Sequence, residues 1–267
     1  MSVRTERLGL AAWAALLATF LALPLLALLV TPSLAELKAG LGHPLVVPAL
    51  RLSAFTTLCS TLLVVALGTP LAWILSRARG RRAAFIESAL QLPLVVPPAV
   101  AGVALLLAFG RQGLLASPLR ALGVSISFST AAVIVAEVFV SAPFFLQAAT
   151  TAFRRVDERL LLVARSFGAS PGRVLGRVAV PLAAPGLLAG AAMAWARALG
   201  EFGATLMFAG NLEGRTQTLP LAIYTALETD LRAAQALSLV LVVLAFALLA
   251  LTRLALARGL SGAEARS

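Results

Sequence analysis

The sequence contains six long runs of apolar residues, and these runs restrict the chain to very few folds. Each run has about 20 residues or more, the length that an α-helix needs to cross the hydrocarbon core of a bilayer. Hydrophobic residues make up 60% of the chain and charged residues only 12%. We therefore expect an all-α polytopic membrane bundle of six transmembrane helices in contact with the lipid bilayer. The runs cover residues 8–31, 49–75, 84–109, 128–151, 181–209 and 234–256.

Basic residues are distributed unevenly among the segments that separate these runs. The formal net charge is +11, which in a soluble protein would suggest nucleic-acid binding. Of the 22 basic residues, 15 lie in the two termini, the 76–82 loop and the 154–177 segment, whereas 6 lie in the alternate segments. Because basic loops stay in the cytoplasm, this asymmetry predicts a multi-pass protein of a bacterial or archaeal cytoplasmic membrane with both termini inside, and no nucleic-acid partner. The first run is too long for a signal peptide, so we expect an uncleaved span.

Residue types that carry chemistry are scarce. The chain has one cysteine, Cys59, one histidine, His43, and 11 acidic residues that are scattered. This composition argues against a membrane enzyme, which would cluster such residues, and against a metal site. The sequence also lacks the phosphate-loop pattern G-x-x-x-x-G-K-[ST]. We expect the chain to bind no cofactor, and any ATP that drives it to be used by a separate ATPase subunit.

The polar break at residues 154–185 has a regular pattern of capping and apolar residues, which an unstructured loop would not need. Asp157 can cap a first helix, and Gly168 suits the left-handed position that ends it. Ser170 and Pro171 then fit the start of a second short helix. The segment is either a docking corner for a soluble partner or an amphipathic hairpin that lies on the lipid headgroups. The apolar positions of the first helix are Leu160, Val163, Ala164 and Phe167.

Prolines interrupt the third, fourth and fifth runs. They include Pro97 and Pro98 in the third run, Pro143 in the fourth, and Pro181 and Pro185 at the start of the fifth. Each break frees backbone groups that a neighbouring helix or a wet cavity must satisfy. The prolines indicate either ordinary helix kinks or a pathway with moving parts between spans three and five, and the sequence leaves both interpretations open.

The fifth run carries a charged pair inside the membrane. Arg197 and Glu201 are four residues apart and share a helix face, and Glu137 in the fourth run is a further candidate partner for Arg197. Gly200 and Gly203 remove side-chain bulk beside the pair, which favours close helix approach. Such charges face protein or a water-filled cavity. The residues form either a buried ion pair or triad that locks spans four and five together, or a polar gate for a tetrahedral oxyanion.

The 154–185 break resembles the cytoplasmic loop of ABC importer permeases, in which Glu-Ala-Ala is followed after three residues by Gly and, about nine residues later, by an apolar residue, one further residue and Leu-Pro. Ala164, Gly168, Val178 and Pro181 match this pattern, whereas Leu162 and Val163 replace Glu-Ala and Val180 replaces Leu. The resemblance implies that residues of about 158–176 form a coupling helix that sits in a groove of the ATPase. The residues that it assigns to coupling are Asp157, Ala164, Arg165, Gly168, Ala169, Ser170, Arg173 and Pro181.

A wider resemblance covers residues of about 50–255. The stretch 197–204, RALGEFGA, is similar to the fifth-span signature of molybdate and sulfate permeases. Residues 214–224, GRTQTLPLAIY, and 92–98, LPLVVPP, resemble the molybdate branch of that family in particular. The resemblance implies the type I ABC importer permease fold and a translocation pathway or gate. The residues implied for that pathway are Pro97, Pro98, Glu137, Arg197, Gly200, Glu201 and Gly203.

The same resemblance implies an activity and a set of partners. The chain would be the permease subunit of an ATP-driven importer of molybdate or tungstate, with a sulfate or thiosulfate permease as the alternative. A secondary anion transporter is a remoter alternative, because the sequence has no internal repeat. The partners would be a second permease copy in a homodimer, an ABC ATPase dimer, and an external or periplasmic molybdate-binding protein. We expect an N-terminal helix and external loop at 1–48, a permease domain at 49–256 with its coupling segment at 154–178, and a cytoplasmic tail at 257–267.

Overall fold

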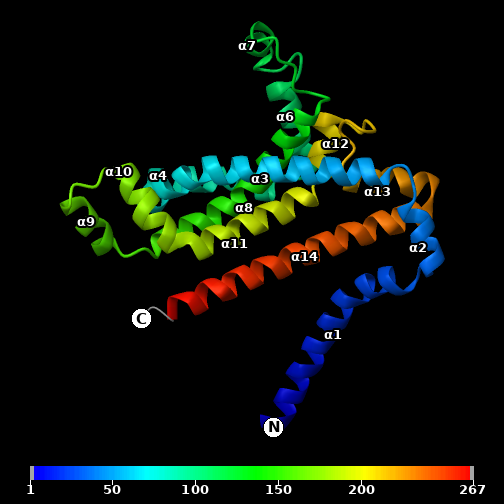
Figure 1. Ribbon diagram of the computed structural model, residues 1–267, viewed down its shortest axis with the longest axis horizontal. Coiled ribbons are helices and arrows are strands. Elements are labelled where there is room, and N and C mark those ends of the chain that lie inside the picture. Colours follow the sequence, from blue (N-terminus) through cyan, green and yellow to red (C-terminus); the bar gives the residue numbers. More distant parts are fainter. Residues whose placement is uncertain (1–2, 265–267) are drawn as a thin grey trace.

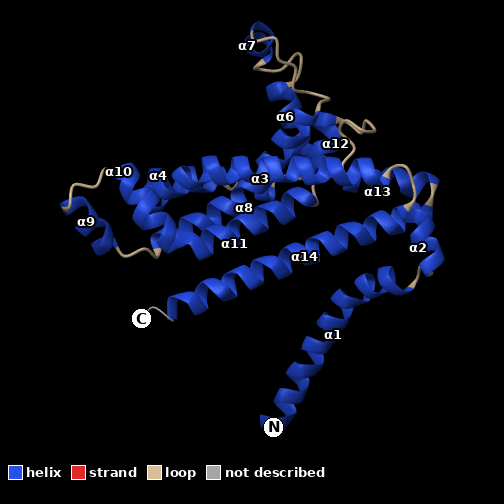
Figure 2. Ribbon diagram, viewed as in Figure 1, coloured by secondary structure: helices blue, strands red, loops and turns tan. Residues whose placement is uncertain are grey.

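The computed structural model describes residues 3–264, and every regular element in that part of the chain is a helix (Figure 2). The apolar character of the sequence explains this, because a spanning segment in lipid must satisfy its backbone groups internally. The elements are α1 (Val3–Val30), α2 (Leu34–Leu41), α3 (Val46–Arg77), α4 (Arg81–Leu90), α5 (Leu92–Val95), α6 (Pro98–Phe109), α7 (Ala116–Ala121), α8 (Thr130–Arg154), α9 (Glu158–Ser166), α10 (Pro171–Val174), the π-helical turn η1 (Leu175–Ala179), α11 (Val180–Leu199), α12 (Gly203–Ala209), α13 (Leu219–Thr229) and α14 (Leu231–Glu264).

Three long helices, α3, α8 and α11, pack side by side as the centre of the molecule (Figure 1). Lipid gives apolar helices little hydrophobic reason to associate, so helices in a membrane associate through close packing. Small residues make this close packing possible. A Cβ atom at Gly68 would lie 2.7 Å from a ring carbon of Phe145, and one at Gly190 would lie 2.9 Å from the Cβ of Ala148. The helix α14 packs against α11 and runs back toward the end of the bundle that carries α9 (Figure 1).

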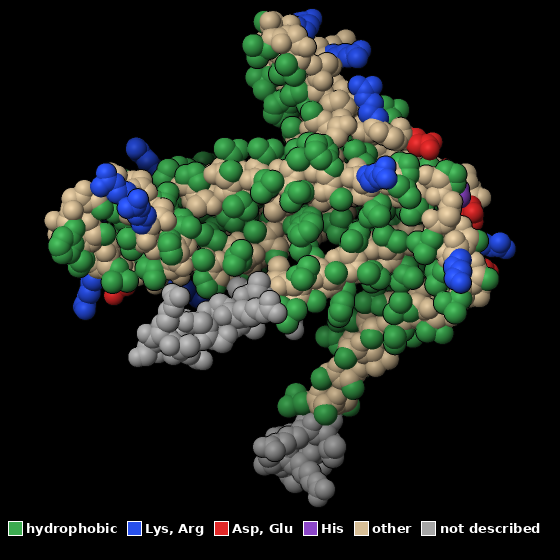
Figure 3. All heavy atoms as spheres, in the orientation of Figure 1, with side chains coloured by type: hydrophobic (Ala, Val, Ile, Leu, Met, Phe, Trp, Pro, Cys, Tyr) green, Lys and Arg blue, Asp and Glu red, His purple; other side chains and the backbone are tan. Residues whose placement is uncertain are grey.

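Five helices in the described part of the chain are long and apolar enough to cross a membrane. They cover Leu10–Val30, Val46–Arg77, Thr130–Arg154, Pro171–Leu199 and Leu231–Thr252. On the face drawn in Figure 3, Lys and Arg side chains gather at the two ends of the bundle and on the projecting α6–α7 region, with hydrophobic side chains between them. This distribution is that of a multi-pass membrane protein.

The expected third span, residues 84–109, is not one helix but three. It divides into α4, α5 and α6, and the last of these is a shorter apolar helix of 12 residues. Prolines explain the division, because Pro93 lies at the start of α5 and Pro97 is the extended residue before α6. As a result, α6 and α7 project away from α3, α8 and α11, and α6 packs mainly against α12 (Figure 1).

The helix α1 lies apart from the central bundle (Figure 1). None of the stretch Leu10–Val30 is buried, and Trp13 and Phe20 are 73% and 70% exposed. Its only substantial contact within the described residues is with α14. A helix with apolar side chains on all sides is suited to a lipid environment, as expected for the first span.

The fifth span differs from the expected range of 181–209 at both ends. It begins with α10 and runs without interruption through η1 to Leu199. The π turn comes directly before Pro181, whose missing N–H group cannot donate to the carbonyl of Arg177. The expected second short helix and the fifth span are therefore a single helix. That helix ends at Leu199, and α12 starts separately at Gly203.

We predict that Gly102→Ala destabilises the protein. A Cβ atom at residue 102 would lie 2.6 Å from the Cβ of Met207 and 2.8 Å from the backbone oxygen of Ala204, so α6 and α12 would have to separate. Overpacking of this kind costs about 1–3 kcal/mol, which should lower the midpoint of thermal unfolding in detergent. Gly172→Ala is the control, because a Cβ atom there meets nothing within 4 Å. Equal midpoints for both variants would contradict the prediction.

Candidate functional site

The break between α11 and α12 contains a buried ion pair. Nη2 of Arg197 lies 2.6 Å from Oε2 of Glu201, and the side chain of Glu201 is 1% exposed. The N–H of the guanidinium is not aligned with this oxygen, so the contact is an ion pair rather than a hydrogen bond. The other carboxylate oxygen, Oε1, accepts the backbone N–H of Ala204 at 2.7 Å. Glu201 therefore caps the start of α12 while it neutralises the last turn of α11.

Glu137 does not join this pair. It lies on α8 with 1% exposure, and its Oε1 accepts the hydroxyl of Thr56 from α3 at 2.8 Å. Within the described residues it forms no ion pair with Arg197, so of the pair and the triad that the sequence left open, the structure has the pair. The carboxylate of Glu137 is met instead by a hydroxyl from α3, which a carboxyl group can use without a cation.

Sequence reasoning missed the polar face of α3. Ser53, Thr56, Thr57 and Ser60 are buried and lie at the 3–4 spacing of one helix face. Thr57 accepts the indole N–H of Trp195 from α11 at 2.9 Å. The hydroxyls thus connect α3 to both α8 and α11. The spacing is visible in the sequence and could have indicated this face.

The glycines and prolines expected near the ion pair differ in how closely they approach neighbouring helices. A Cβ atom at Gly203 would lie 2.8 Å from the Cβ of Pro98, so α12 begins in tight contact with the start of α6. Pro97 is the extended residue that precedes α6 and is exposed. At Gly200 a Cβ atom would meet only the carbonyl oxygen of Ala196, at 3.8 Å. The expected close approach is therefore found at Gly203 and not at Gly200.

The segment between α8 and α11 forms a corner at one end of the bundle (Figure 1). The carboxylate of Asp157 accepts the N–H of Arg159 at 2.9 Å and caps α9, as predicted. Gly168 has φ +78° in the left-handed region, also as predicted. Ser170 precedes α10 as expected, but its hydroxyl does not cap that helix. Ala169 donates its N–H to the carbonyl of Ala164 at 3.1 Å, which closes the corner.

The two sides of α9 have different environments. Leu161 is buried, and Ala164 and Ala169 pack against the core that α3, α8 and α11 share. On the other side, Phe167 is 88% exposed. The corner therefore presents an apolar surface outward, with arginines around it. The exposed apolar residues are Leu160, Leu162, Val163 and Phe167, and the exposed arginines are Arg165, Arg173 and Arg177.

Ion pairs hold α9 against the ends of other helices, which the sequence reasoning did not anticipate. Oε1 of Glu158 lies 3.6 Å from Arg77 and 3.2 Å from Arg79. Arg77 also donates to the carbonyl of Phe153 at 3.0 Å and lies 4.6 Å above the ring of Trp73. The sequence signal that could have predicted these pairs is Glu158, an acidic residue at the start of α9, together with the basic loop at 76–82. These contacts connect the corner to α3.

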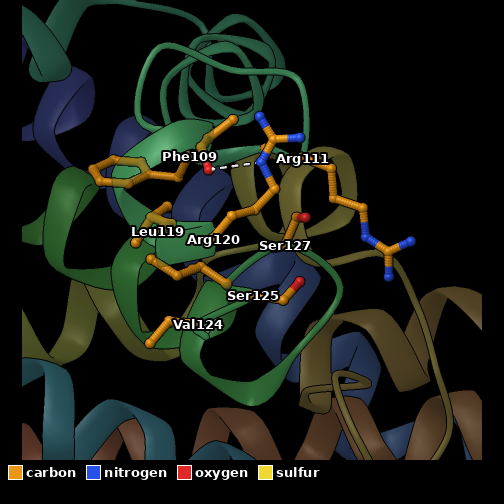
Figure 4. A pocket seen from close by; sticks show the side chains of 10 residues that line it. Phe109, Arg111, Leu119, Arg120, Val124, Ser125 and Ser127 are labelled. Atoms are coloured by element: carbon orange, nitrogen blue, oxygen red, sulfur yellow. Dashed lines mark hydrogen bonds between the residues drawn. The ribbon is translucent and has the colours of Figure 1, made fainter. Parts of the chain in front are cut away.

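Apart from the charged break and the corner, a pocket of about 400 Å³ lies beside α6 and α7 (Figure 4). Arg111, Arg120, Ser125 and Ser127 line it, and Nε of Arg120 donates to the carbonyl of Ala116 at 3.3 Å. In Figure 4 the guanidinium groups of Arg111 and Arg120 point in different directions, so they do not converge on one anion. Among the residues searched, no group of His, Cys, Asp and Glu is placed to hold a metal ion.

The structure is thus a helical membrane bundle with a charged break between α11 and α12 and an outward-facing helical corner at one end. Residues 65–260 match the family model described as the binding-protein-dependent transport system inner membrane component. The match covers more than half of the sequence, and the chain belongs to this family.

Curated relatives and solved structures agree with that assignment. The chain is 48% identical over 226 residues to the molybdenum transport system permease protein ModB of Mycobacterium tuberculosis, which covers 85% of this chain and 86% of the relative. It is 36% identical over 204 residues to ModB of Escherichia coli, covering 76% and 89%. Its fold is similar to a chain of a bacterial ABC transporter involved in alginate import, with a TM-score of 0.72, 14% identity and coverage of 96% and 98%. A chain of the MetNI methionine ABC transporter gives a TM-score of 0.63 at 20% identity, covering 80% and 96%.

We predict that Arg197→Met destabilises the protein by about 3 kcal/mol, because it leaves the carboxylate of Glu201 buried without its cation. Adding Glu201→Gln should recover most of this loss, since the amide oxygen can still accept the N–H of Ala204. The measurement is a double-mutant cycle of thermal unfolding in detergent. Additive effects of the two substitutions would show that the residues do not act as a pair.

Proposed function

We propose that this chain is the transmembrane subunit of an ATP-driven importer of molybdate, with tungstate as a related substrate. The observation that carries the choice of substrate is the 48% identity to a molybdenum transport permease along 85% of the chain. The motif at 197–204 supports a permease for molybdate or sulfate, and the motif at 214–224 supports molybdate in particular. Sulfate and thiosulfate are the alternative substrates, because the first of these motifs is shared with their permeases.

The proposed assembly contains two copies of this chain, an ABC ATPase dimer and an external or periplasmic molybdate-binding protein. The excess of arginine at the α9 end supports a cytoplasmic location for the corner and for both termini, in a bacterial or archaeal cytoplasmic membrane. Residues 49–256 would form the permease domain, with the N-terminal helix at 1–48 and a tail at 257–267. This chain would bind no cofactor, because ATP would be bound and hydrolysed by the partner.

We assign ATPase docking to the corner formed by α9, Gly168 and α10. Its outward surface is apolar and surrounded by arginines, which suits insertion into a groove on a soluble protein. The coupling residues would be Asp157, Ala164, Arg165, Gly168, Ala169, Ser170, Arg173 and Pro181. Leu162 stands where related permeases carry Glu, so docking would depend on shape and apolar contact more than on a carboxylate at that position.

The helix that leaves this corner supplies a route for the motion. Pro171–Leu199 is continuous, and its 29 residues extend over about 43 Å at the rise of an α-helix. One end touches the proposed docking surface, and the other end carries Arg197 beside Glu201. When nucleotide closes the ATPase dimer, a rigid helix of this length would shift the charged break. This is alternating access driven by a two-state partner.

The charged break would act as a polar gate rather than as a tight binding site. Glu201 already neutralises Arg197, so a passing dianion finds a cation without being held strongly. Pro97, Pro98 and Glu137 would line or support the moving parts around it, together with Gly200 and Gly203.

Substrate uptake tests the proposal directly. The permease, ATPase and binding protein would be reconstituted in proteoliposomes, and uptake of labelled molybdate measured with unlabelled tungstate and sulfate as competitors. We expect ATP-dependent uptake that tungstate inhibits strongly and sulfate weakly, and we expect Arg197→Ala to abolish it. Uptake of sulfate in preference to molybdate would show that sulfate is the substrate. Uptake without the ATPase would show that the protein is a secondary transporter rather than part of an ABC importer.

We also predict that Gly168→Val uncouples the complex. Space at Gly168 is open, since a Cβ atom there meets nothing within 4 Å, so the substitution acts through the backbone at φ +78°. A β-branched residue in the left-handed region costs about 1–2 kcal/mol, which would distort the corner while the transmembrane bundle stays folded. The measurements are ATPase binding and molybdate uptake, with Gly176→Val as the control at an exposed helical position. Unchanged uptake by Gly168→Val would overturn the role of the corner.

A further inference from the structure

A groove lies between α8 and α11 in the half of the bundle that ends at α9. Its volume is about 360 Å³, and its walls include Phe144, Gln147, Thr151, Arg155, Gly186 and Met193. Gly186 on α11 lines the groove, and Gly190 lies one turn further along the same helix. Gly186 packs directly on Ala152, and a Cβ atom at Gly190 would lie 2.9 Å from the Cβ of Ala148. The backbones are therefore close, and longer side chains on either side form the walls of an open channel.

The wall on α8 is polar although it belongs to a spanning helix. Gln147, Thr151 and Arg155 are four residues apart, so they lie on one face, and all three are exposed. The hydroxyl of Thr151 donates to the carbonyl of Gln147 at 2.8 Å. Within the described part of the chain, the Gln147 amide and the Arg155 guanidinium have neither hydrogen bond nor ion pair. Since lipid would leave such groups unsatisfied at considerable cost, this face must meet water or a polar ligand.

The wall on α11 leads to the charged break. Ala189, Met193 and Arg197 are four residues apart, so the groove face of α11 continues to the guanidinium of Arg197. The side chain of Arg197 is 26% exposed, so the guanidinium is not fully covered by the protein. A line of exposed groups thus extends from Arg197 past Met193 and Gln147 to Arg155 at the end of the bundle.

The chemistry of this line suits an anion. Arg155 is the one charged residue among those that line the groove, and it is basic. Gln147 offers amide N–H donors, and no carboxylate lies among the lining residues. A tetrahedral oxyanion needs N–H or O–H donors at successive positions, without a cluster that would trap it.

We propose that the α8–α11 groove is the inner half of the substrate pathway, in which Gln147 and Arg155 receive the oxyanion after it passes Arg197. The inference rests on the proposed function and deepens it, since it assigns residues to the exit of the same transporter. The groove is filled with water and faces the space between two copies of the chain rather than lipid.

Cysteine labelling tests the position of the groove without reference to the substrate. In a Cys59→Ala background of the reconstituted complex, Met193→Cys is compared with Leu188→Cys. The two native side chains are 50% and 53% exposed, but they lie about 140° apart around α11. Because only a hydrated thiol ionises and reacts, we expect an impermeant anionic thiol reagent to modify residue 193 about tenfold faster than residue 188. Equal rates, or faster reaction at 188, would overturn the proposal.

Substitutions at Gln147 test its contact with the anion. Gln147→Glu places a negative charge in the path, and repulsion should lower molybdate uptake about tenfold. Gln147→Asn keeps the amide and should retain most of the uptake, while binding of the ATPase stays unchanged in both variants. Equal uptake by the Glu and Asn variants would exclude Gln147 from the pathway. If the wild-type complex imports no molybdate, the proposed function fails, whereas the labelling result still decides whether the groove is a hydrated path.

Discussion

The carboxylate of Glu201 is the group on which the centre of this molecule depends. A helix that breaks inside a membrane exposes N–H and C=O groups that lipid cannot satisfy. Glu201 accepts the N–H of Ala204 with one oxygen and contacts the guanidinium of Arg197 with the other. Each interaction supports the other, because the cation offsets the cost of burying the carboxylate that caps α12. The change of direction between α11 and α12, and with it the docking of α12 on α6, follows from this arrangement.

The corner at the other end of α11 is tied to the bundle by several weak contacts rather than one strong one. The ion pairs of Glu158 with Arg77 and Arg79 are exposed, and such pairs contribute about 0–1 kcal/mol each. Arg77 adds its hydrogen bond to Phe153 and its position above Trp73. Distributed contacts of this kind fix the orientation of α9 relative to α3, yet they can be exchanged for contacts with a partner at little cost. The docking role that we propose for this corner requires both properties, because such an element must transmit force in one state and rearrange in another.

Features set by neighbouring residues could be predicted from the sequence, and features set by distant ones could not. The Asp157 cap and the left-handed Gly168 are local, and both predictions were confirmed. The third span was mispredicted because average hydropathy over residues 84–109 conceals the effect of three prolines on the backbone. The cost of a charge in lipid indicated that Glu137 faces protein or a cavity, but the sequence did not reveal its neighbour, since Thr56 lies 81 residues earlier. Likewise, the hydroxyl of Ser53 accepts the N–H of Leu219, 166 residues away, a contact that no local pattern encodes.

The position of a cation beside its own carboxylate bears on how an anion could pass. An arginine without a partner in a low-dielectric span would attract a dianion strongly and release it slowly. The side chain of Arg197 is 26% exposed while that of Glu201 is covered, so an anion could approach the guanidinium without displacing the carboxylate. The net attraction for the anion is then the attraction by Arg197 minus the repulsion by Glu201. A small movement of α11 relative to α12 changes this net attraction. A charge pair located at a helix break is therefore more sensitive to helix motion than the same pair inside a continuous helix would be, because the backbone between its members can bend.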